Sequence, residues 1–376
     1  MKLKEICEYI SDRVAVTAVS KENYISTENM AQNKGGVTRS SSIPSSGVVI
    51  RYTTDDILIS NIRPYFKKIW QADKTGGCSA DVLCIRAKNH IDSTFLYYLL
   101  SQDAFFEYVM TGAKGCKMPR GDKGHIMDWE IDIPENKSEQ TAIGQCLKML
   151  DKKIEINKQI NDNLEQQAQA AFNNFLAKYS ECETINLSEI ATLNPKRTIT
   201  KGTLARSIEM AQLPTSGSFP AGWDMKEYNG GMKFQNGDTL MARITPCLEN
   251  GKVAYINFLE ENEVAFGSTE YIVIASKGVI APEVFYFLTR HNDFVDFAVK
   301  NMNGSSGRQR VSAETIGTYK LPVISPEDMV MLETIAKEAL NKIKYNSLEN
   351  IRLSEMRDTL LPKLMSGELK INEIDC

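Results

Sequence analysis

SEQTAIGQCLKMLDKKIEINKQINDNLEQQAQAAFNNFLAKY, residues 138–179, carries a seam of side chains in alternating steps of four and three. No proline interrupts the stretch, and Glu, Gln, Lys and Ala, which favour helices, fill most other positions. It predicts one helix of roughly 40 residues, about 60 Å long at the α-helical rise. The 3.5-residue spacing is typical of a coiled coil, so this helix needs a partner. The seam consists of Ile143, Leu147, Leu150, Ile154, Asn157, Asn161, Leu164, Ala168, Ala171 and Phe175.

A second stretch with the same seam runs from Pro326 to Ser366. Its seam positions follow the first set at a constant offset of 189 residues, which indicates an internal repeat. The second seam therefore predicts the partner helix within the same chain. It consists of Leu332, Ala336, Ala339, Ile343, Asn346, Asn350, Leu353, Arg357, Leu360 and Leu364.

Two asparagines occupy equivalent positions in each seam. If the helices run antiparallel, the register that pairs Asn157 with Asn350 also pairs Asn161 with Asn346. A polar layer lowers the stability of a coiled coil but penalises slipped registers, because a slip leaves buried amides unpaired. We predict that these four asparagines lock the register. The weakest layer contains Arg357, whose stem has to snorkel outward.

The composition is that of an ordinary globular protein. The chain has 376 residues, 42% hydrophobic and 24% charged, enough for two or three domains. It has no apolar run long enough to span a membrane and no signal-peptide pattern, so we expect a cytoplasmic protein with no membrane partner. Its eight cysteines form no CxxC pair, which predicts reduced thiols and no metal site. A net charge of −4 argues against coating nucleic acid through bulk charge but allows local basic faces.

The segments that precede the two long helices share an apolar framework. Asp238–Pro246 aligns with Asp56–Pro64, and Gly267–Ile274 aligns with Cys78–Ile85. We expect an α+β protein, with two similar mixed α/β globular domains separated by two long antiparallel coiled-coil helices in a pseudo-two-fold arrangement. The expected boundaries are 1–137 for the first globular domain, 138–180 for the first spacer helix, 181–324 for the second globular domain, and 325–376 for the second spacer helix and tail.

Periodicity also predicts individual elements in the first globular domain. Strands are expected at Val48–Tyr52, Ile57–Ser60 and Val82–Ile85, where short apolar runs lie between turn residues. One helix is expected from Thr94 to Met110, and a last strand from Trp129 to Ile133.

Three motifs and their order resemble a known family. They are the Asp-x-Leu-x-x-Arg-Ile-x-Pro core at Asp238–Pro246, the Gly-Ser-Thr-Glu strand at Gly267–Glu270, and the helix end Leu360–Leu369. Each is short, but their doubled order over nearly the whole chain resembles the specificity subunit of type I restriction–modification systems.

The resemblance implies a division of labour among subunits. It implies two target recognition domains that each read half of a split sequence in double-stranded DNA, and two spacer helices that set the unread gap. It also implies two methyltransferase subunits docked on these helices, and restriction subunits that act as motor and nuclease through the complex. S-adenosylmethionine is then expected in the methyltransferase subunits, and no cofactor in this chain.

Basic and polar residues in loops are the candidates for DNA contact, because Lys and Arg bind phosphates and Arg, Asn, Gln and Ser read base edges. The main clusters are two glycine-flanked loops at equivalent places in the repeat. The competing interpretation for each is a solvated loop or a loop that faces the long helices. For Arg63 and Arg243, near strand ends, it is a structural ion pair. The candidates are Lys34, Arg39, Arg63, Lys114, Lys117, Arg120, Lys123, Lys196, Arg197, Lys201, Arg206, Arg243, Ser305, Ser306, Arg308, Gln309 and Arg310.

Catalytic motifs are missing from the sequence. There is no Walker loop, HExxH or GxSxG, and Asn194-Pro195-Lys196 does not fit the Asn/Asp-Pro-Pro-aromatic motif of an adenine methyltransferase. We therefore expect a non-catalytic DNA-binding subunit with no catalytic, cofactor or metal residues. A bilobed scaffold that binds proteins, and a nuclease or methyltransferase in its own right, remain as alternatives.

Overall fold

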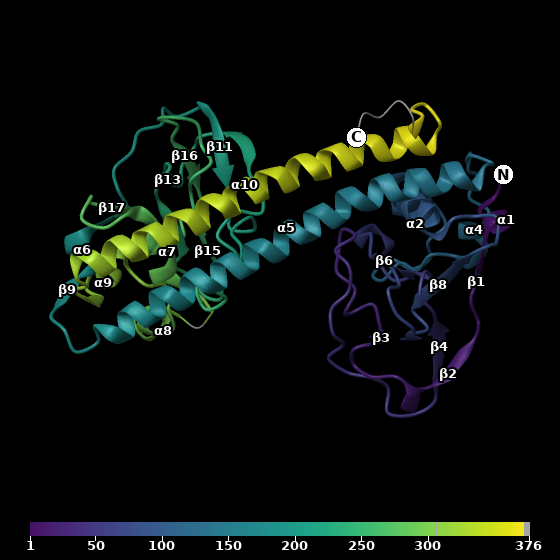
Figure 1. Cartoon of the computed structure of the whole chain (residues 1–376), viewed down its shortest axis with the longest axis horizontal. Helices are drawn as coiled ribbons and strands as arrows, with labels where there is room; N and C mark the ends of the chain where they lie inside the picture. The colour runs from purple at the N-terminus through teal and green to yellow at the C-terminus, as the bar shows by residue number, and fades with distance from the viewer. Residues whose placement is uncertain (306, 372–376) are drawn as a thin grey trace. The chain divides into compact units, whose positions relative to one another are not determined.

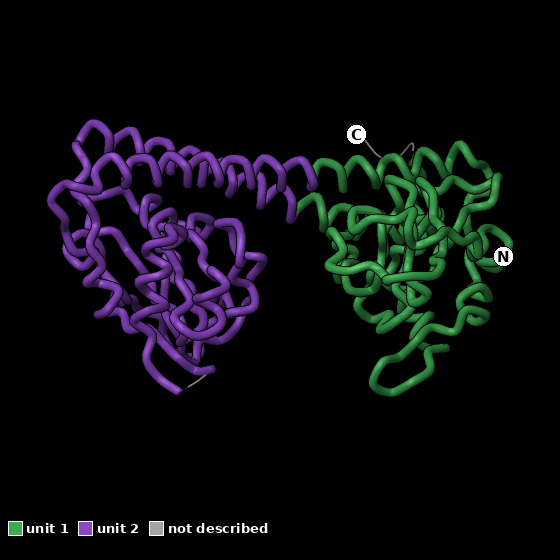
Figure 2. Tube along the Cα trace, turned by 90° about the horizontal axis from the view of Figure 1, so that it is seen from below, with its two compact units in different colours: residues 1–153, 352–376 green, residues 154–351 purple. Residues whose placement is uncertain are grey.

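A computed structural model of the protein describes residues 1–305 and 307–371 (Figure 1). The chain forms two compact units, shown in different colours in Figure 2. Unit 1 contains residues 1–153 and the chain from Arg352, and unit 2 contains residues 154–351. Each unit therefore combines one globular domain with a segment of each long helix.

The two long helices are α5 (Lys137–Lys178) and α10 (Pro326–Met365). Their bounds agree with the predicted helices to within one residue at each end. Before α5, the side chain of Asn136 accepts a hydrogen bond from the Ser138 N–H at 2.9 Å, as an N-cap does. Pro326 opens α10 at a position where its missing N–H has no helical partner to lose, and two acidic residues follow it in the first turn.

In unit 2 the two helices run side by side and antiparallel, joined by amide pairs in their seam. Asn157 Nδ2 donates to Asn350 Oδ1 at 2.9 Å, and Asn346 Nδ2 donates to Asn161 Oδ1 at 2.8 Å. These are the pairs of the predicted antiparallel register. Asn157 and Asn346 are only 1% and 3% exposed, so a slipped register would bury these amides without partners.

The sequence predicts that the Arg357 side chain of α10 snorkels outward, but in the structure it forms an ion pair. In unit 1 its Nη1 atom lies 2.6 Å from Asp151 Oδ1 of α5, and the Tyr98 hydroxyl donates to the other carboxylate oxygen at 2.7 Å. The carboxylate thus joins both long helices and a helix of the globular domain through one side chain.

The globular domain of unit 1 contains two four-stranded sheets, in the orders β1-β8-β5-β6 and β2-β4-β7-β3. The strands are β1 (Cys7–Tyr9), β2 (Arg13–Ala15), β3 (Tyr24–Ile25), β4 (Val48–Tyr52), β5 (Ile57–Ser60), β6 (Ile69–Gln71), β7 (Gly76–Cys78) and β8 (Val82–Ala87). The helices are α1 (Leu3–Ile6), α2 (Ser93–Ser101), α3 (Asp103–Thr111) and α4 (Lys123–Met127), with 3₁₀ turns η1 (Val16–Ala18) and η2 (Pro64–Phe66).

Unit 2 contains two four-stranded sheets, β10-β17-β14-β15 and β12-β11-β16-β13, and the two-stranded sheet β18-β9. The strands are β9 (Thr184–Asn186), β10 (Ala191–Leu193), β11 (Leu204–Ile208), β12 (Asp224–Glu227), β13 (Met232–Phe234), β14 (Thr239–Ala242), β15 (Val253–Tyr255), β16 (Ala265–Gly267), β17 (Tyr271–Ser276) and β18 (Lys320–Pro322). The helices are α6 (Leu187–Ile190), α7 (Pro282–Arg290), α8 (Asn292–Lys300) and α9 (Ala313–Gly317).

The two domains repeat one topology, as predicted, with a difference in the second sheet. The sheets β1-β8-β5-β6 and β10-β17-β14-β15 are both antiparallel throughout and match strand for strand. In the second sheets, β3 and β11 run parallel to β7 and β16, while β4 and β13 run antiparallel to them. The fourth strand differs: β2 pairs with β4, but β12 pairs with β11, at the opposite edge of the repeated three strands.

Each hydrophobic core includes side chains of both long helices. In unit 1, Ile143 and Leu147 of α5 and Leu364 of α10 join the core formed by α2, α3 and the first sheet. In unit 2, Phe172 of α5 and Leu332 of α10 join the corresponding core. Burying each of these side chains contributes about 1.5–3 kcal/mol, so the long helices are part of the domains that they carry.

Two expected elements differ from the structure. The helix predicted from Thr94 to Met110 is divided into α2 and α3, because Gln102 adopts an extended backbone conformation between them. The strand predicted at Trp129–Ile133 is absent from the described secondary structure, where Glu130 makes an isolated bridge with Lys2. The N-terminal amino group instead donates to Ile131 O at 2.9 Å.

Replacing Asn161 by leucine should destabilise the protein, because it leaves the buried Asn346 amide without its acceptor. We expect a loss of about 1–3 kcal/mol, and recovery in the double variant N161L/N346L, where an apolar pair replaces two amides. Denaturant unfolding of the full chain measures both. The exposed residue Asn163 on α5 supplies the control, since N163L should leave the midpoint almost unchanged. Equal losses in N161L and N163L would contradict the role of the amide pair.

Candidate nucleic-acid interface

A short hairpin, loop A (114–120), projects from the first globular domain. Its ends are joined by two backbone hydrogen bonds of 2.9 Å, one in each direction between Lys114 and Arg120. Its second half is tied to the loop after β5, because Arg63 N donates to Pro119 O at 2.8 Å. The backbone of loop A is therefore held by the sheet, while its tip residues Lys117 and Met118 are exposed.

An equivalent hairpin, loop B (303–310), occupies the same place in the second domain. Asn303 and Arg310 exchange two backbone hydrogen bonds of 2.9 Å, and Thr245 N donates to Gln309 O at 3.1 Å. Ser305 and Arg308 are exposed, and Gln309 is partly buried. The predicted contact Ser306 lies outside the described residues.

An arginine–carboxylate pair lies at the base of each hairpin. Arg120 Nη2 is 3.0 Å from Asp81 Oδ1, and Arg310 binds Glu270 through both Nε and Nη2 at 2.7–3.0 Å. The Arg310 guanidinium lowers the pKa of Glu270, so the pair stays ionised at neutral pH. Each arginine keeps part of its guanidinium exposed at a fixed position, with side-chain exposures of 60% and 40%.

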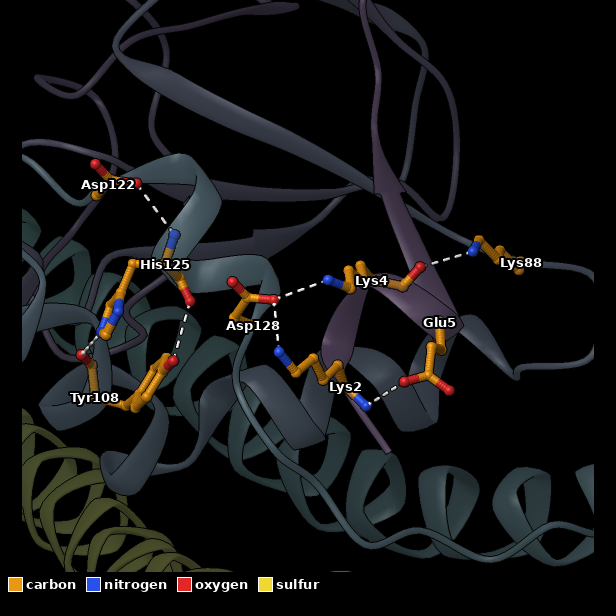
Figure 3. A network of polar contacts seen from close by, with 8 residues as sticks. All are labelled: Lys2, Lys4, Glu5, Lys88, Tyr108, Asp122, His125 and Asp128. Atoms are coloured by element: carbon orange, nitrogen blue, oxygen red, sulfur yellow. Dashed lines mark hydrogen bonds and ion pairs between the residues drawn. The ribbon is translucent and has the colours of Figure 1, made fainter.

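Loop A is anchored further by Asp122, the N-cap of α4 (Figure 3). Asp122 Oδ1 accepts from the N–H groups of Gly124 and His125, and Oδ2 lies 2.7 Å from Lys114 Nζ. The hydrogen bond from Lys114, aided by the two backbone donors, lowers the pKa of Asp122 to about 2. Asp122 therefore stays charged over the whole physiological range and holds the Lys114 side chain at the base of loop A.

The same network fixes α4 against its neighbours (Figure 3). The His125 ring stacks on Tyr108 at 4.3 Å between ring centroids, and the Tyr108 hydroxyl donates to His125 O at 3.1 Å. At the other end of α4, Lys2 and Lys4 both reach Asp128, at 3.1 and 2.9 Å. These contacts give His125 a structural role and hold the segment from which loop A emerges.

Several predicted contacts remain exposed. Lys123 is exposed at the start of α4, with its ammonium 5.6 Å from the Tyr9 ring centroid. Lys196 and Lys201 are exposed in the second domain. Arg39 is exposed and pairs with Glu22 at 2.8 Å. In contrast to loops A and B, no described backbone contact brings these four residues to either hairpin.

Lys34 and Arg63 come together in the first domain. The loop of Lys34 hydrogen bonds to the turn that follows Arg63, through Lys34 N and Lys67 O at 2.9 Å. Arg243, at the corresponding strand end of the second domain, lies beside the base of loop B, because Val311 N donates to its carbonyl at 3.0 Å. The buried Nε atoms of Arg63 and Arg243 have no hydrogen-bond acceptor among the described residues.

Arg197 and Arg206 are instead directed into the second domain. Arg197 is 12% exposed and lies 2.5 Å from Asp238, which is itself buried. Arg206 lies 2.7 Å from Glu263 and over the Trp223 ring at 5.7 Å. Both arginines therefore form ion pairs within the second domain, and neither is included in the DNA-contacting set proposed below.

Some residues of this surface were missed by sequence reasoning. Asp81 and Glu270 orient the hairpin arginines, and a signal existed, because they are acidic residues at matched positions of the repeat. Tyr65 lies in η2 and Lys67 directly follows it, and their isolated positions in the sequence gave no reason to group them with Lys34.

Among residues 1–305 and 307–371, no group of three or more His, Cys, Asp or Glu side chains could hold a metal ion. Over the same residues, none of the helices is both long enough and apolar enough to cross a membrane.

Comparison with known proteins gives a family match in the first half of the chain and similar proteins over a longer stretch. Residues 1–166 match the family model of the type I restriction modification DNA specificity domain. The chain is 20% identical over 354 residues to the type I restriction enzyme HindI specificity subunit of Haemophilus influenzae, covering 73% of this chain and 77% of that protein. It is 30% identical over 196 residues to the EcoAI specificity subunit of Escherichia coli, covering 50% of this chain but only 33% of that protein.

The fold is also similar to a solved structure, the type I restriction–modification system S subunit from M. genitalium. The TM-score is 0.61 and the sequence identity 18%, over 97% of this chain and 95% of that chain. Residues 1–166 thus match a DNA specificity domain, and the duplicated fold is that of a solved S subunit. The chain as a whole is similar to type I restriction–modification specificity subunits.

The structural role of Arg197 is open to test. R197A leaves the Asp238 carboxylate buried and unpaired, which should cost about 3–5 kcal/mol of unfolding free energy. Burial already raises the pKa of Asp238 to about 6, against the opposing effect of Arg197. The folded state thus takes up a proton more readily than the unfolded state, so the deficit of R197A should shrink as the pH falls from 7 toward 4.

Denaturant unfolding at several pH values measures this deficit, and R197A/D238N should recover part of it. Unchanged stability of R197A, accompanied by weaker DNA binding, would instead return Arg197 to the set of DNA contacts.

Proposed function

We propose that this protein is the sequence-specific DNA-binding subunit of a type I restriction–modification complex, in which each globular domain reads one half of a bipartite target. In this proposal loops A and B present side chains to base edges, while nearby lysines contact phosphates. The chain itself performs no catalysis. S-adenosylmethionine is held by two methyltransferase subunits, and restriction subunits join through the complex.

The observation that carries the proposal is the repeat of one hairpin site on two copies of a scaffold. Arg120 with Asp81 and Arg310 with Glu270 lie at equivalent positions, tied to equivalent strand ends. The tips between them differ, Gly-Cys-Lys-Met-Pro in loop A and Gly-Ser-Ser-Gly-Arg-Gln in loop B. A common frame with different exposed side chains suits one task performed on two different sequences.

The long helices suit a second task in this proposal. Their seam is apolar except for the asparagine layers and Arg357, and their outer faces carry most of the polar residues. We propose that they set the distance between the two half-sites and dock the methyltransferase subunits. Half-sites about one helical turn of DNA apart, roughly 34 Å, are what two readers on one face of a duplex require.

A binding assay tests the proposal against the alternative of a protein-interaction scaffold. The full-length chain with its methyltransferase subunits should retard a duplex that carries the target, identified by mapping methylated adenines in the host genome. A duplex with one scrambled half-site should bind more weakly. Binding that is absent, or equal on both duplexes, would favour the scaffold.

Arg308→Ala should weaken recognition of one half-site only. Arg308 is exposed on loop B, and loss of a base contact typically costs about 1–3 kcal/mol. Competition with duplexes altered in one half-site at a time measures the effect, and the exposed Lys277→Ala, away from loop B, is the control. A uniform loss on every sequence would identify a phosphate contact instead.

Inserting one heptad into both long helices should lengthen the preferred gap. The insertions belong between Lys153 and Ile154 in α5 and between Leu353 and Ser354 in α10, which face each other in the observed register. Seven residues add about 10 Å, or about three base pairs. Because three base pairs also rotate the duplex by roughly 100°, affinity should fall as the gap preference shifts.

Selection from duplexes with varied gaps measures this preference. A heptad inserted into α5 alone breaks the register and serves as the control. An unchanged gap preference in the matched insertion would refute the spacer role of the helices.

A further inference from the structure

Two facing loops of the first domain hold cations in a backbone conformation that side chains disfavour. Lys34, Arg63 and Lys67 have φ angles of +62°, +51° and +50°, in the left-handed region. They are the only lysines or arginines with positive φ among residues 1–305 and 307–371. Backbone strain of this kind persists where the surrounding structure enforces it, and it concentrates at functional sites.

The surrounding structure does enforce this arrangement. Asn33 N donates to Phe66 O at 2.8 Å and Lys34 N to Lys67 O at 2.9 Å, so the two loops are joined through their backbones. The lysine ammonium groups converge on Asp103, at 3.3 Å from Lys34 and 2.8 Å from Lys67. The Asp103 side chain is 58% exposed, so this pairing point lies at the surface.

The surface carries more positive charge than its one carboxylate neutralises. Arg63 opens the same turn as Lys67, with its guanidinium carbon 6.0 Å from the Phe66 ring centroid. Tyr65 on the same turn is 46% exposed and brings a hydroxyl donor. Three cations against one carboxylate, with a tyrosine beside them, match the donors that bind DNA phosphates. The turn also joins loop A directly, through Arg63 N and Pro119 O.

The described part of the second domain lacks this surface although it repeats the scaffold. Thr245 stands where the first domain has Arg63, and Gly251 (φ +67°) takes the left-handed position of Lys67. Glycine adopts this conformation without strain, so the backbone conformation does not explain why residue 67 is a lysine. By contrast, Lys68 and its counterpart Lys252 both donate to a backbone carbonyl, of Thr27 and Met210, and are structural in both domains.

We propose that Lys34, Arg63, Tyr65 and Lys67 form a phosphate-binding surface that makes the first domain the electrostatic anchor of the protein on duplex DNA, with no equivalent in the second domain. The inference rests on the proposed DNA-binding function. It adds a chemical class of contact, sequence-independent binding of phosphodiesters, and assigns it to one domain.

Lys67→Gly provides a sharp test, because glycine suits the backbone there and removes the charge. The stability of K67G should equal or exceed that of the wild type. Its binding should weaken equally on cognate and unrelated duplexes, and its affinity should fall about 3.5-fold less between 50 and 200 mM salt, the effect of one lost phosphate contact. K67Q, which keeps the left-handed side chain but removes the charge, should show the same salt dependence.

The matched control is Asn262→Gly, which relieves an exposed left-handed residue (φ +61°) in the second domain without changing charge. N262G should bind DNA like the wild type. All variants are compared as full-length chains with the methyltransferase subunits, on a target duplex and on a duplex of unrelated sequence.

The outcomes separate this inference from the proposed function. Specific binding that is unaffected by K67G and K67Q, or weakened at one half-site only, overturns the phosphate surface but leaves the function. Binding that lacks sequence preference but loses the salt-dependent part in K67G supports the surface and overturns base reading. Absence of any duplex binding by the wild type overturns both.

Discussion

The alignment of the two long helices is the constraint on which the rest of the structure depends. Amide pairs between Asn157 and Asn350 and between Asn161 and Asn346 define one register, because any other leaves buried amides without partners. The cores of both globular domains include side chains from both helices, so the same register also decides which apolar residues face each domain. One register therefore determines both the alignment of the helices and their packing against the domains. The polar layer specifies that register at a small cost in stability.

Within each domain, the exposed chemistry is separated from the parts that maintain the fold. Loops A and B are held at their bases by backbone hydrogen bonds and by an arginine–carboxylate pair, and neither support depends on the tip residues. Tip residues can therefore change without disturbing the sheets. The basic surface around Lys67 departs from this pattern, since its cations lie at constrained backbone positions that a glycine would fill more easily.

Much of the architecture was predictable from the sequence because it is periodic. The seams, the offset between them and the matched strands predicted both long helices, the asparagine pairs and the position of the two hairpins. Long-range side-chain pairing could not be predicted. The partners of Arg197 and Arg206 lie 41 and 57 residues away in the sequence, so no neighbouring residue indicated that these arginines form ion pairs. The break at Gln102 was missed because no proline or glycine marks it. The left-handed conformation of Lys34 and Lys67 likewise could not be predicted from the sequence and appears only in the backbone angles of the structure.

The fourth strand of each second sheet has a consequence for folding a chain that contains the same motif twice. β2 covers the outer side of β4 in one domain, whereas β12 covers the outer side of β11 in the other, so the two sheets leave different strands unpaired at their edges. An unpaired edge can recruit a strand from a homologous neighbour. Here the edge that β2 covers in the first domain is open at β13 in the second, and the edge that β12 covers in the second is open at β3 in the first. Each capping strand therefore finds a free edge in the other copy of the motif, which makes exchange of these two strands the misfolding route specific to this repeat.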